Sequence, residues 1–261
     1  MKPREIAIVL RNLILGVNLE SLHMVANPRQ MVSVVTECLF VSRCINSTDH
    51  IPQRQVWDVL GAHSEVSVTL YGDAASEWFR PTASYTADLV AMCILCQIIK
   101  PKVIFEIGTF HGAGALHWAA NAPQANVYTL DLPPDTLPSL GTTTADQMHV
   151  GARSRKKRMF FDDHAASTRI HPVYGDSATY DFGPFAGKVD LFFIDGAHSY
   201  DYVRNDSLKA LNCSHHGSII AWHDYGRVGF NGVSRWLHEF ARKGNHLYRV
   251  PGGSLVFMRV E

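Results

Sequence analysis

The chain has 261 residues, of which 46% are hydrophobic and 18% are charged, and its 24 basic residues balance its 24 acidic ones. This length is enough to bury a sizeable core, as one large domain or as a domain with an appendage. A formal net charge of zero argues against a whole-protein attraction to nucleic acid or to a membrane surface.

Residues 1–84 differ from the rest of the chain. Apolar residues recur at helical spacing from Ile6 to Ile14 and again from Met31 to Leu39, which predicts two helices. We expect this N-terminal helical extension to act as a cap on the main domain or as an oligomerisation segment in a homodimer. Residues 47–84 are mixed and polar, and their sequence predicts no defined element.

Features of the whole chain favour a cytoplasmic protein. Charged residues interrupt the apolar N-terminus, which makes it a poor signal peptide. The longest uncharged apolar runs have about eleven residues, short of the ~20 that a membrane-spanning helix needs. The five cysteines are an odd number, which indicates reduced thiols. Cys93 and Cys96 form a CxxC inside an apolar helical run, where core packing is favoured over a redox or metal role.

From residue 85 onward, predicted strands and helices alternate. In chain order they are helix 85–99, strand 103–107, helix 113–121, strand 126–130, strand 170–174, strand 189–194, helix 199–211, strand 217–222 and helix 232–242. This rhythm predicts an α/β domain with a mostly parallel sheet and helices on both faces. HLYRV and SLVFMRV, separated by glycines, predict an antiparallel hairpin at one edge, giving seven strands. The segment 132–168 is long enough to be a lid. Its basic run, 153–158, fits a solvated surface, and a phosphate- or nucleic-acid-binding role is the weaker alternative because no aromatic residues are interleaved with it.

The segment 103–112, VIFEIGTFHG, predicts a buried strand, a tight turn and the start of a helix whose N–H groups face a ligand. Gly108 and Gly112 would let the backbone approach that ligand, and Glu106 adds a carboxylate. Phe110 and Ala113 stand where a dinucleotide-binding motif has its second and third glycines, which argues against an NAD-linked oxidoreductase.

Polar residues also follow the later strands. Because ligands bind at the carboxyl ends of the strands in open α/β sheets, these residues predict one shared site. They are Asp131, Asp176, Ser177, Asp195, His198, His223 and Asp224.

The E-x-G-x-x-x-G pattern at 106–112, together with the FIDGAHSYDYVRND and WHDY segments, resembles the class I S-adenosylmethionine-dependent methyltransferases. The likeness is greatest to the small-molecule O-methyltransferases that act on sugars and antibiotics. It spans residues 85–261 and implies a Rossmann-like methyltransferase domain there. It also implies S-adenosylmethionine as cofactor and a sugar, phenolic or natural-product hydroxyl as methyl acceptor, with no nucleic-acid or membrane partner.

The resemblance also implies roles for single residues. Asp131 would accept hydrogen bonds from both ribose hydroxyls, a selective, charge-assisted contact, although an acid before Pro133 also fits a turn. Asp195 would lie under the sulfonium or bind a metal. The full set of implied cofactor contacts is Glu106, Gly108, Gly112, Asp131, Asp176, Ser177 and Asp195.

Methyl transfer to an alcohol needs a general base or a metal, because the hydroxyl resists deprotonation at neutral pH. Asp195, His198 and His223 are the catalytic candidates. A divalent cation on Asp195, His223 and Asp224 is a second hypothesis. Metal-dependent relatives carry an acidic or amide pair where this chain has His223, and histidine suits a transition metal better than magnesium. Structural roles, His198 starting a helix and His223 packing beside Trp222, stay open.

A second function belongs to a different class of protein. A domain that binds S-adenosylmethionine without catalysis would act in an assembly or in regulation. The acids and histidines at two strand ends favour the enzyme, because a domain that only binds the cofactor does not require all of these residues.

Overall fold

The computed structural model describes residues 51–61, 65–78, 85–133, 136–143, 146–147, 158–227 and 229–261. The two helices predicted within residues 6–39 and the basic residues 153–157 lie outside these ranges.

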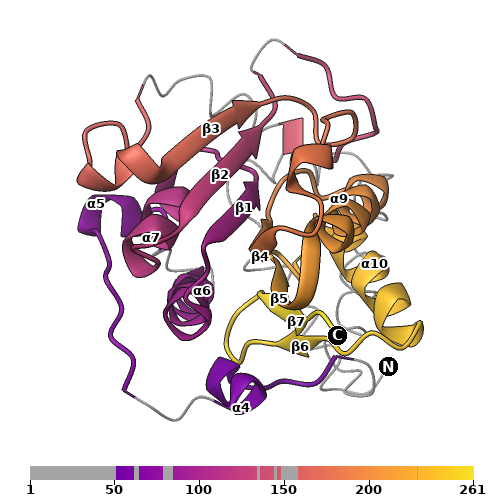
Figure 1. Ribbon diagram of the computed structural model, residues 1–261. Coiled ribbons are helices and arrows are strands. Elements are labelled where there is room, and N and C mark those ends of the chain that lie inside the picture. The colour runs from indigo at the N-terminus through magenta and orange to yellow at the C-terminus, as the bar shows by residue number, and fades with distance from the viewer. Residues whose placement is uncertain are drawn as a thin grey trace, which may run out of the picture.

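A seven-stranded sheet with the order β3-β2-β1-β4-β5-β7-β6 forms the centre of the described structure (Figure 1). The first five strands along this order are parallel, and β7 pairs antiparallel with both β5 and β6. This confirms the predicted parallel sheet and its antiparallel hairpin. The strands are β1 Val103–Ile107, β2 Asn126–Asp131, β3 Ile170–Tyr174, β4 Val189–Ile194, β5 Ser214–Trp222, β6 Tyr248–Arg249 and β7 Val256–Arg259.

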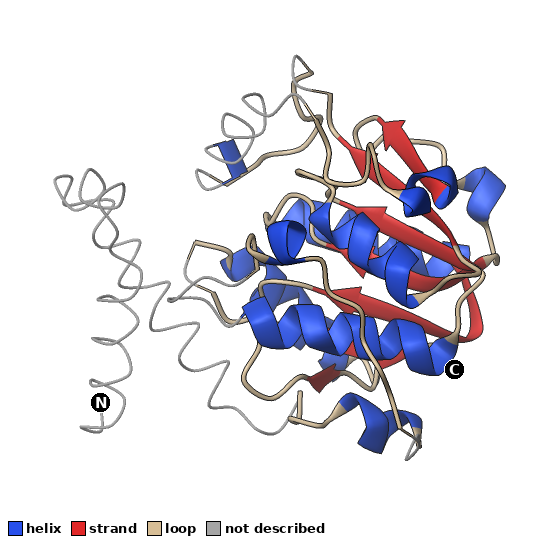
Figure 2. Cartoon of the chain, turned by 90° about the vertical axis from the view of Figure 1, so that its left-hand side faces the viewer, coloured by secondary structure: helices blue, strands red, loops and turns tan. Residues whose placement is uncertain are grey.

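Helices cover both faces of the sheet, as predicted (Figures 1 and 2). One face packs against α6 and α7 and the other against α9 and α10. The sequence prediction and the structure agree within about three residues at each end of these elements. The helices are α4 Val56–Leu60, α5 Gly72–Ala75, α6 Tyr85–Ile99, α7 Ala113–Asn121, α9 Tyr200–Cys213 and α10 Asn231–Arg242, with 3-10 turns η1 Ala165–Arg169 and η2 Gly183–Phe185.

Side chains of the buried strands alternate between the two faces, because the period of a strand is two residues. On β1, Ile104 joins the core under α6 and α7, whereas Phe105 and Ile107 join the core under α9 and α10. Glu106 therefore points towards α7.

Part of the segment before residue 85 belongs to the same core. Ala74, Ala75 and Trp78 pack with α6 and α7. Arg54 donates its backbone N–H to the carbonyl of Arg249 on β6 at 3.1 Å, next to a bridge between Gln53 and Arg249. The domain boundary at residue 84 stays a prediction, but residues within 51–61 and 65–78 contribute directly to the sheet domain.

The sheet ends in two short or interrupted outer strands. Pro172 stands in the middle of β3, and β6 has only two residues.

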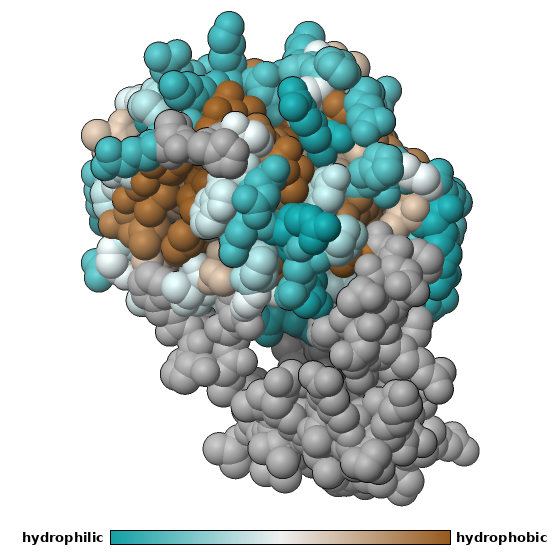
Figure 3. Space-filling model, turned by 90° about the horizontal axis from the view of Figure 1, so that it is seen from below, coloured by the Kyte–Doolittle hydropathy of each residue, from teal (hydrophilic) through white to brown (hydrophobic). Residues whose placement is uncertain are grey.

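Apolar side chains also reach the surface on the face seen from below in Figure 3. The most exposed large hydrophobic side chains among the described residues are Trp57, Leu70, Leu137, Tyr174 and Leu208.

Cys93 and Cys96 are fully buried in α6 and carry free thiols, in agreement with core packing. Within the described ranges, no helix combines the length and apolar character required to cross a bilayer.

Candidate functional site

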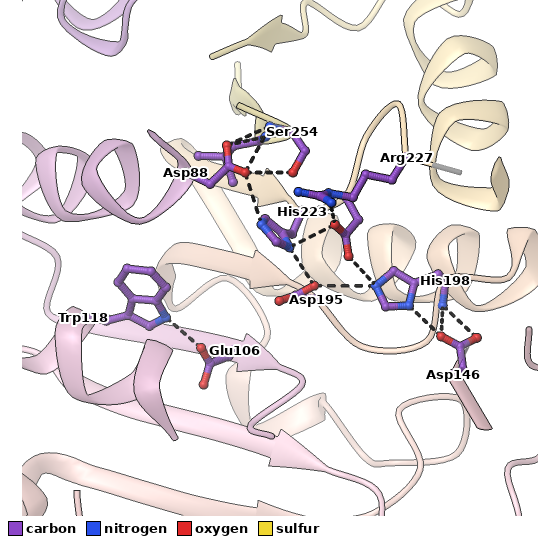
Figure 4. Close-up of polar contacts among 11 residues, drawn as sticks. Asp88, Glu106, Trp118, Asp146, Asp195, His198, His223, Arg227 and Ser254 are labelled. Atoms are coloured by element: carbon purple, nitrogen blue, oxygen red, sulfur yellow. Dashed lines mark hydrogen bonds and ion pairs between the residues drawn. The ribbon is translucent and has the colours of Figure 1, made fainter. Parts of the chain in front are cut away.

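Four polar residues meet where β4 and β5 end. Ile194 pairs with Trp222, so Asp195 and His223, the next residues of each strand, are neighbours. His223 Nδ1 lies 3.1 Å from Asp195 Oδ1 (Figure 4). Asp224 follows with a φ of 59°, a left-handed conformation that is uncommon outside glycine and that often marks functional sites.

His198 completes this group from the turn before α9. Its Nε2 lies 3.1 Å from Asp224 Oδ2 and 3.7 Å from Asp195 Oδ1. The Nε2 is buried and forms no aligned hydrogen bond. Ligand atoms of Asp195, His198 and Asp224 all lie within 4.8 Å of one another, close enough to hold a metal ion. His223, which the sequence predicted as a ligand, contributes no atom to that set.

His223 is held between two carboxylates. Its Nδ1 faces Asp195, and its Nε2 lies 3.3 Å from Oδ2 of Asp88. Asp88 is fully buried in α6 and accepts hydrogen bonds from the backbone and hydroxyl of Ser254 and from the backbone of Leu255. Burial lowers the pKa of His223, but the charges of Asp195 and Asp224 raise it well above its ordinary value. These two charges favour the protonated, positively charged form of the ring.

Negative charge dominates the site. Arg227 is the permanent cation in contact with it, with Nε 2.7 Å from Asp224 Oδ1. Burial raises the pKa of Asp224, but His223 and His198 hold it well below its ordinary value. Burial likewise opposes a proton on His198, whereas its bonds to Asp146, Asp195 and Asp224 raise its pKa well above the usual range. The cluster therefore needs protonated histidines or a bound cation to balance its carboxylates.

The turn after β1 lies beside the end of β2. Phe110 adopts a φ of 50°, and its backbone N–H donates to Asp131 Oδ2 at 3.0 Å. The N–H of Gly108 donates to the carbonyl of Leu130. Asp131 is half-buried at the strand end, beside this turn.

The two motif glycines are required by contacts within the protein. A Cβ on Gly108 would lie 2.0 Å from the carbonyl oxygen of Asp195, and one on Gly112 would lie 2.4 Å from the ring of Phe161. Both distances are far inside van der Waals contact. The first glycine therefore lets β1 approach the end of β4 closely, and the second accommodates the segment before η1.

Asp176, at the end of β3, is occupied by other parts of the chain. Its carboxylate accepts hydrogen bonds from the backbone of Ser139, from the backbone of Ala178 and from the hydroxyl of Tyr202. The hydroxyl of Tyr202 contacts both carboxylate oxygens, and a contact of Asp176 with adenine stays a prediction. Ser177 beside it is also buried.

A small hollow lies at the ends of β4 and β5. Asp195, His198 and His223 line it, whereas Glu106 and Asp131 do not.

Comparison with known proteins agrees with this geometry. The model of a family described as a methyltransferase domain matches residues 105–225, which contain the turn after β1 and the whole polar cluster. This match and the fold agree with the resemblance of the sequence to the class I S-adenosylmethionine-dependent methyltransferases.

The chain is similar to solved methyltransferases at low sequence identity. The calicheamicin methyltransferase CalS11 is 16% identical with a TM-score of 0.50, over 89% of this chain and 93% of that one. The Podospora anserina methyltransferase PaMTH1, solved with S-adenosylhomocysteine, is 18% identical with a TM-score of 0.49, over 90% and 97%. TomG of Streptomyces achromogenes, an O-methyltransferase of tomaymycin synthesis solved with S-adenosylmethionine, is 15% identical with a TM-score of 0.47, over 72% and 87%.

Three residues that contact the polar cluster lie outside the sequence prediction. Asp88 is an acid in an otherwise apolar helix, which is a detectable signal of a buried partner. Asp146 binds His198 from the long loop, 52 residues away in sequence, and Arg227 lies three residues beyond Asp224. Neither of these two carries a local signal.

The hydrogen-bond partners of Glu106, in the motif at 106–112, differ from those expected from the sequence. Its two oxygens accept hydrogen bonds from Trp118 Nε1 at 2.7 Å and from Thr129 Oγ1 at 2.5 Å, away from the polar cluster (Figure 4). A Cβ on Gly114 would lie 2.4 Å from Glu106 Oε1, so that glycine allows α7 to cover the acid. The observed contacts of Glu106 join β1 to α7 and β2, and its contact with the cofactor stays a prediction.

We expect Glu106→Gln to remove a pH dependence of stability. Burial raises the pKa of Glu106 from 4.5 to about 8, although the bonds from Thr129 and Trp118 lower it. The folded state thus binds this proton more tightly than the unfolded state, and the free energy of unfolding falls as pH rises from about 5 to 8. The glutamine has no proton to lose, so by about pH 9 the variant should gain on the order of 4 kcal/mol relative to wild type.

Urea unfolding of both proteins at about pH 5 and pH 9 measures this gain. Glu65→Gln, at an exposed position, is the matched control and should follow the wild type at both values. A difference between Glu106→Gln and wild type that is the same at both pH values would mean that Glu106 is ionised throughout.

Proposed function

We propose that the protein transfers the methyl group of S-adenosylmethionine to a hydroxyl group of a small molecule. The observation that carries this proposal is the buried group of Asp195, His198 and Asp224 at the ends of β4 and β5. Carboxylates and imidazoles suit the deprotonation of an alcohol, which is the difficult part of O-methylation at neutral pH.

Cofactor binding is assigned to the turn after β1 and the end of β2. S-adenosylmethionine supplies an activated methyl group on a positively charged sulfur. Asp131, held by the N–H of Phe110, would accept hydrogen bonds from the ribose hydroxyls, a charge-assisted contact. Asp195 would offset the charge of the sulfonium, which is costly to bury without a counter-charge. The predicted contacts of Glu106, Gly108, Gly112, Asp176 and Ser177 remain part of this proposal.

The polar cluster also fits a divalent metal. Asp195, His198 and Asp224 offer two carboxylates and one imidazole, and His198 Nε2 is buried without a hydrogen bond. The nitrogen ligand favours a transition metal over magnesium. A bound cation would supply positive charge next to the acceptor oxygen. His223 contacts Asp195 and would orient that ligand from behind.

The general base that deprotonates the acceptor hydroxyl is assigned to the same carboxyl ends of β4 and β5. Where no metal is bound, His198 and His223 are both candidates for the base, and both line the hollow at the strand ends. The small-molecule acceptor, a homodimer and a cytoplasmic location stay predictions from the sequence.

Asp131→Asn tests the cofactor site. We expect the Kd for S-adenosylhomocysteine to rise about 10- to 100-fold, because hydrogen bonds to a charged acceptor contribute roughly 1.5–3 kcal/mol. Titration calorimetry measures the change. Asp181→Asn is the matched control, since Asp181 is exposed and likewise accepts one backbone N–H, from Gly183. Unchanged affinity in Asp131→Asn would remove the ribose role.

A further inference from the structure

Asp146 binds His198 at three points. Its Oδ1 lies 2.6 Å from His198 Nδ1, and its two oxygens accept the backbone N–H of the same residue at 3.2 and 3.3 Å. Both side chains are more than nine-tenths buried. Asp146 is itself fixed by Thr143, whose N–H donates to Oδ2 at 2.8 Å and whose hydroxyl accepts the N–H of Asp146. One carboxylate therefore fixes the main chain and the ring of His198 together.

This contact determines which nitrogen of His198 faces the site. A carboxylate only accepts, so Nδ1 must carry hydrogen, and Nε2 is turned towards Asp224 and Asp195. The ring of Phe230 stacks on the imidazole with centroids 4.0 Å apart, which prevents rotation of the ring. Where a histidine binds a metal, such a carboxylate on its other nitrogen orients the ring and raises its basicity.

The loop that delivers Asp146 is anchored at a second point. The N–H of Ser139 donates to Asp176 Oδ2 at 2.6 Å, and the N–H of Leu140 reaches the hydroxyl of Tyr202 at 3.4 Å. Tyr202 also binds Asp176. The loop thus runs from the end of β3, where the adenine is expected, to His198 beyond β4.

We propose that Asp146, which lies in the loop between β2 and β3, is a positioning residue. It orients His198 Nε2 towards Asp195 and Asp224. The inference rests on the proposed function, because it assigns His198 as metal ligand or base. It makes docking of the loop a condition for an ordered site. An enzyme with this loop displaced would keep Asp195 and Asp224 in place but lose the orientation of His198.

Asp146→Ala and Asp146→Asn test the proposal against Asp162→Ala. Asp162 lies in the same connection and accepts the N–H of Met159 three residues earlier at 2.8 Å, as Asp146 does with Thr143. It is exposed and serves as the matched control. The probes are Co²⁺ alone, followed by calorimetry and visible absorption, and the proton NMR spectrum of the imidazole N–H groups.

Wild type should show a slowly exchanging downfield N–H from His198, identified by its absence in His198→Gln. Asp146→Ala should lose this resonance and bind Co²⁺ about 10- to 100-fold more weakly. Asp146→Asn keeps an oxygen that can accept a hydrogen bond, and it should recover part of the Co²⁺ affinity. A merely structural role of the negative charge would not predict this recovery. Asp162→Ala should stay within about twofold of wild type in Co²⁺ affinity, because the aspartate it removes lies outside the site.

Retention of both the resonance and the Co²⁺ affinity in a folded Asp146→Ala would overturn the proposal. Failure of the metal hypothesis and failure of the proposed function give different results. If wild type binds no Co²⁺, the metal hypothesis fails, and the N–H resonance together with a fall in kcat at unchanged KM decides the role of Asp146. If the resonance and affinity respond as expected but no methyl transfer occurs, the proposed function fails and the positioning role stands.

Discussion

Asp195→Ala should lower kcat for methyl transfer by about 10³-fold, within the range reported for loss of an acid–base or metal-binding group. The side chain contacts His223 and lies within reach of His198, so its removal disrupts both candidate routes for activating the acceptor. Binding of S-adenosylhomocysteine, which lacks the sulfonium charge, should change much less than binding of S-adenosylmethionine. Transfer of a labelled methyl group and calorimetry with both compounds measure the two effects.

Asp190→Asn is the control at the other end of β4. Asp190 accepts the backbone N–H groups of Lys102 and Val103 at 2.8 Å, far from the carboxyl edge of the sheet, and its substitution should leave kcat nearly unchanged. Full activity in Asp195→Ala would refute the assigned site. Cofactor binding in the wild type without any methyl transfer would instead favour the non-catalytic binding module.

Removal of metal should lower activity by about 100-fold or more if the cluster of Asp195, His198 and Asp224 binds a cation that activates the acceptor. Dialysis against excess chelator, followed by measurement of bound metal and of turnover, tests this. Mn²⁺, Co²⁺ or Fe²⁺ should restore more activity than Mg²⁺, because the site contains an imidazole nitrogen.

His198→Gln separates a specific site from adventitious metal. This variant loses the nitrogen ligand, so the advantage of Co²⁺ over Mg²⁺ should shrink. Undiminished turnover in chelated protein that contains almost no metal would leave His198 as a base and end the metal hypothesis.

The sequence predicted the strand ends well because the signals there are local. Apolar runs such as 103–107 and 189–194 stop at Gly108 and at Asp195, and the structure has both strands with the same bounds. The pairing of β4 with β5 then brings Asp195 next to His223. Parallel topology alone made this neighbourhood predictable.

The unpredicted parts depend on contacts between distant segments. Asp88 binds Ser254, 166 residues further along the chain, and no pattern near Asp88 indicates that partner. Glu106 was assigned by its place in a motif, whereas its direction follows from the alternation of side chains along β1 and from the position of Trp118 on α7. Sequence motifs identified the right edge of the sheet but not which way each acid points.

The two outermost strands of the described sheet are poor templates for further pairing. A neighbouring chain extends a sheet only along a regular row of unpaired amides and carbonyls. Pro172 removes one N–H from the five-residue β3, and β6 offers only two residues. Strand-to-strand stacking into fibrils is therefore disfavoured at both edges of the described sheet.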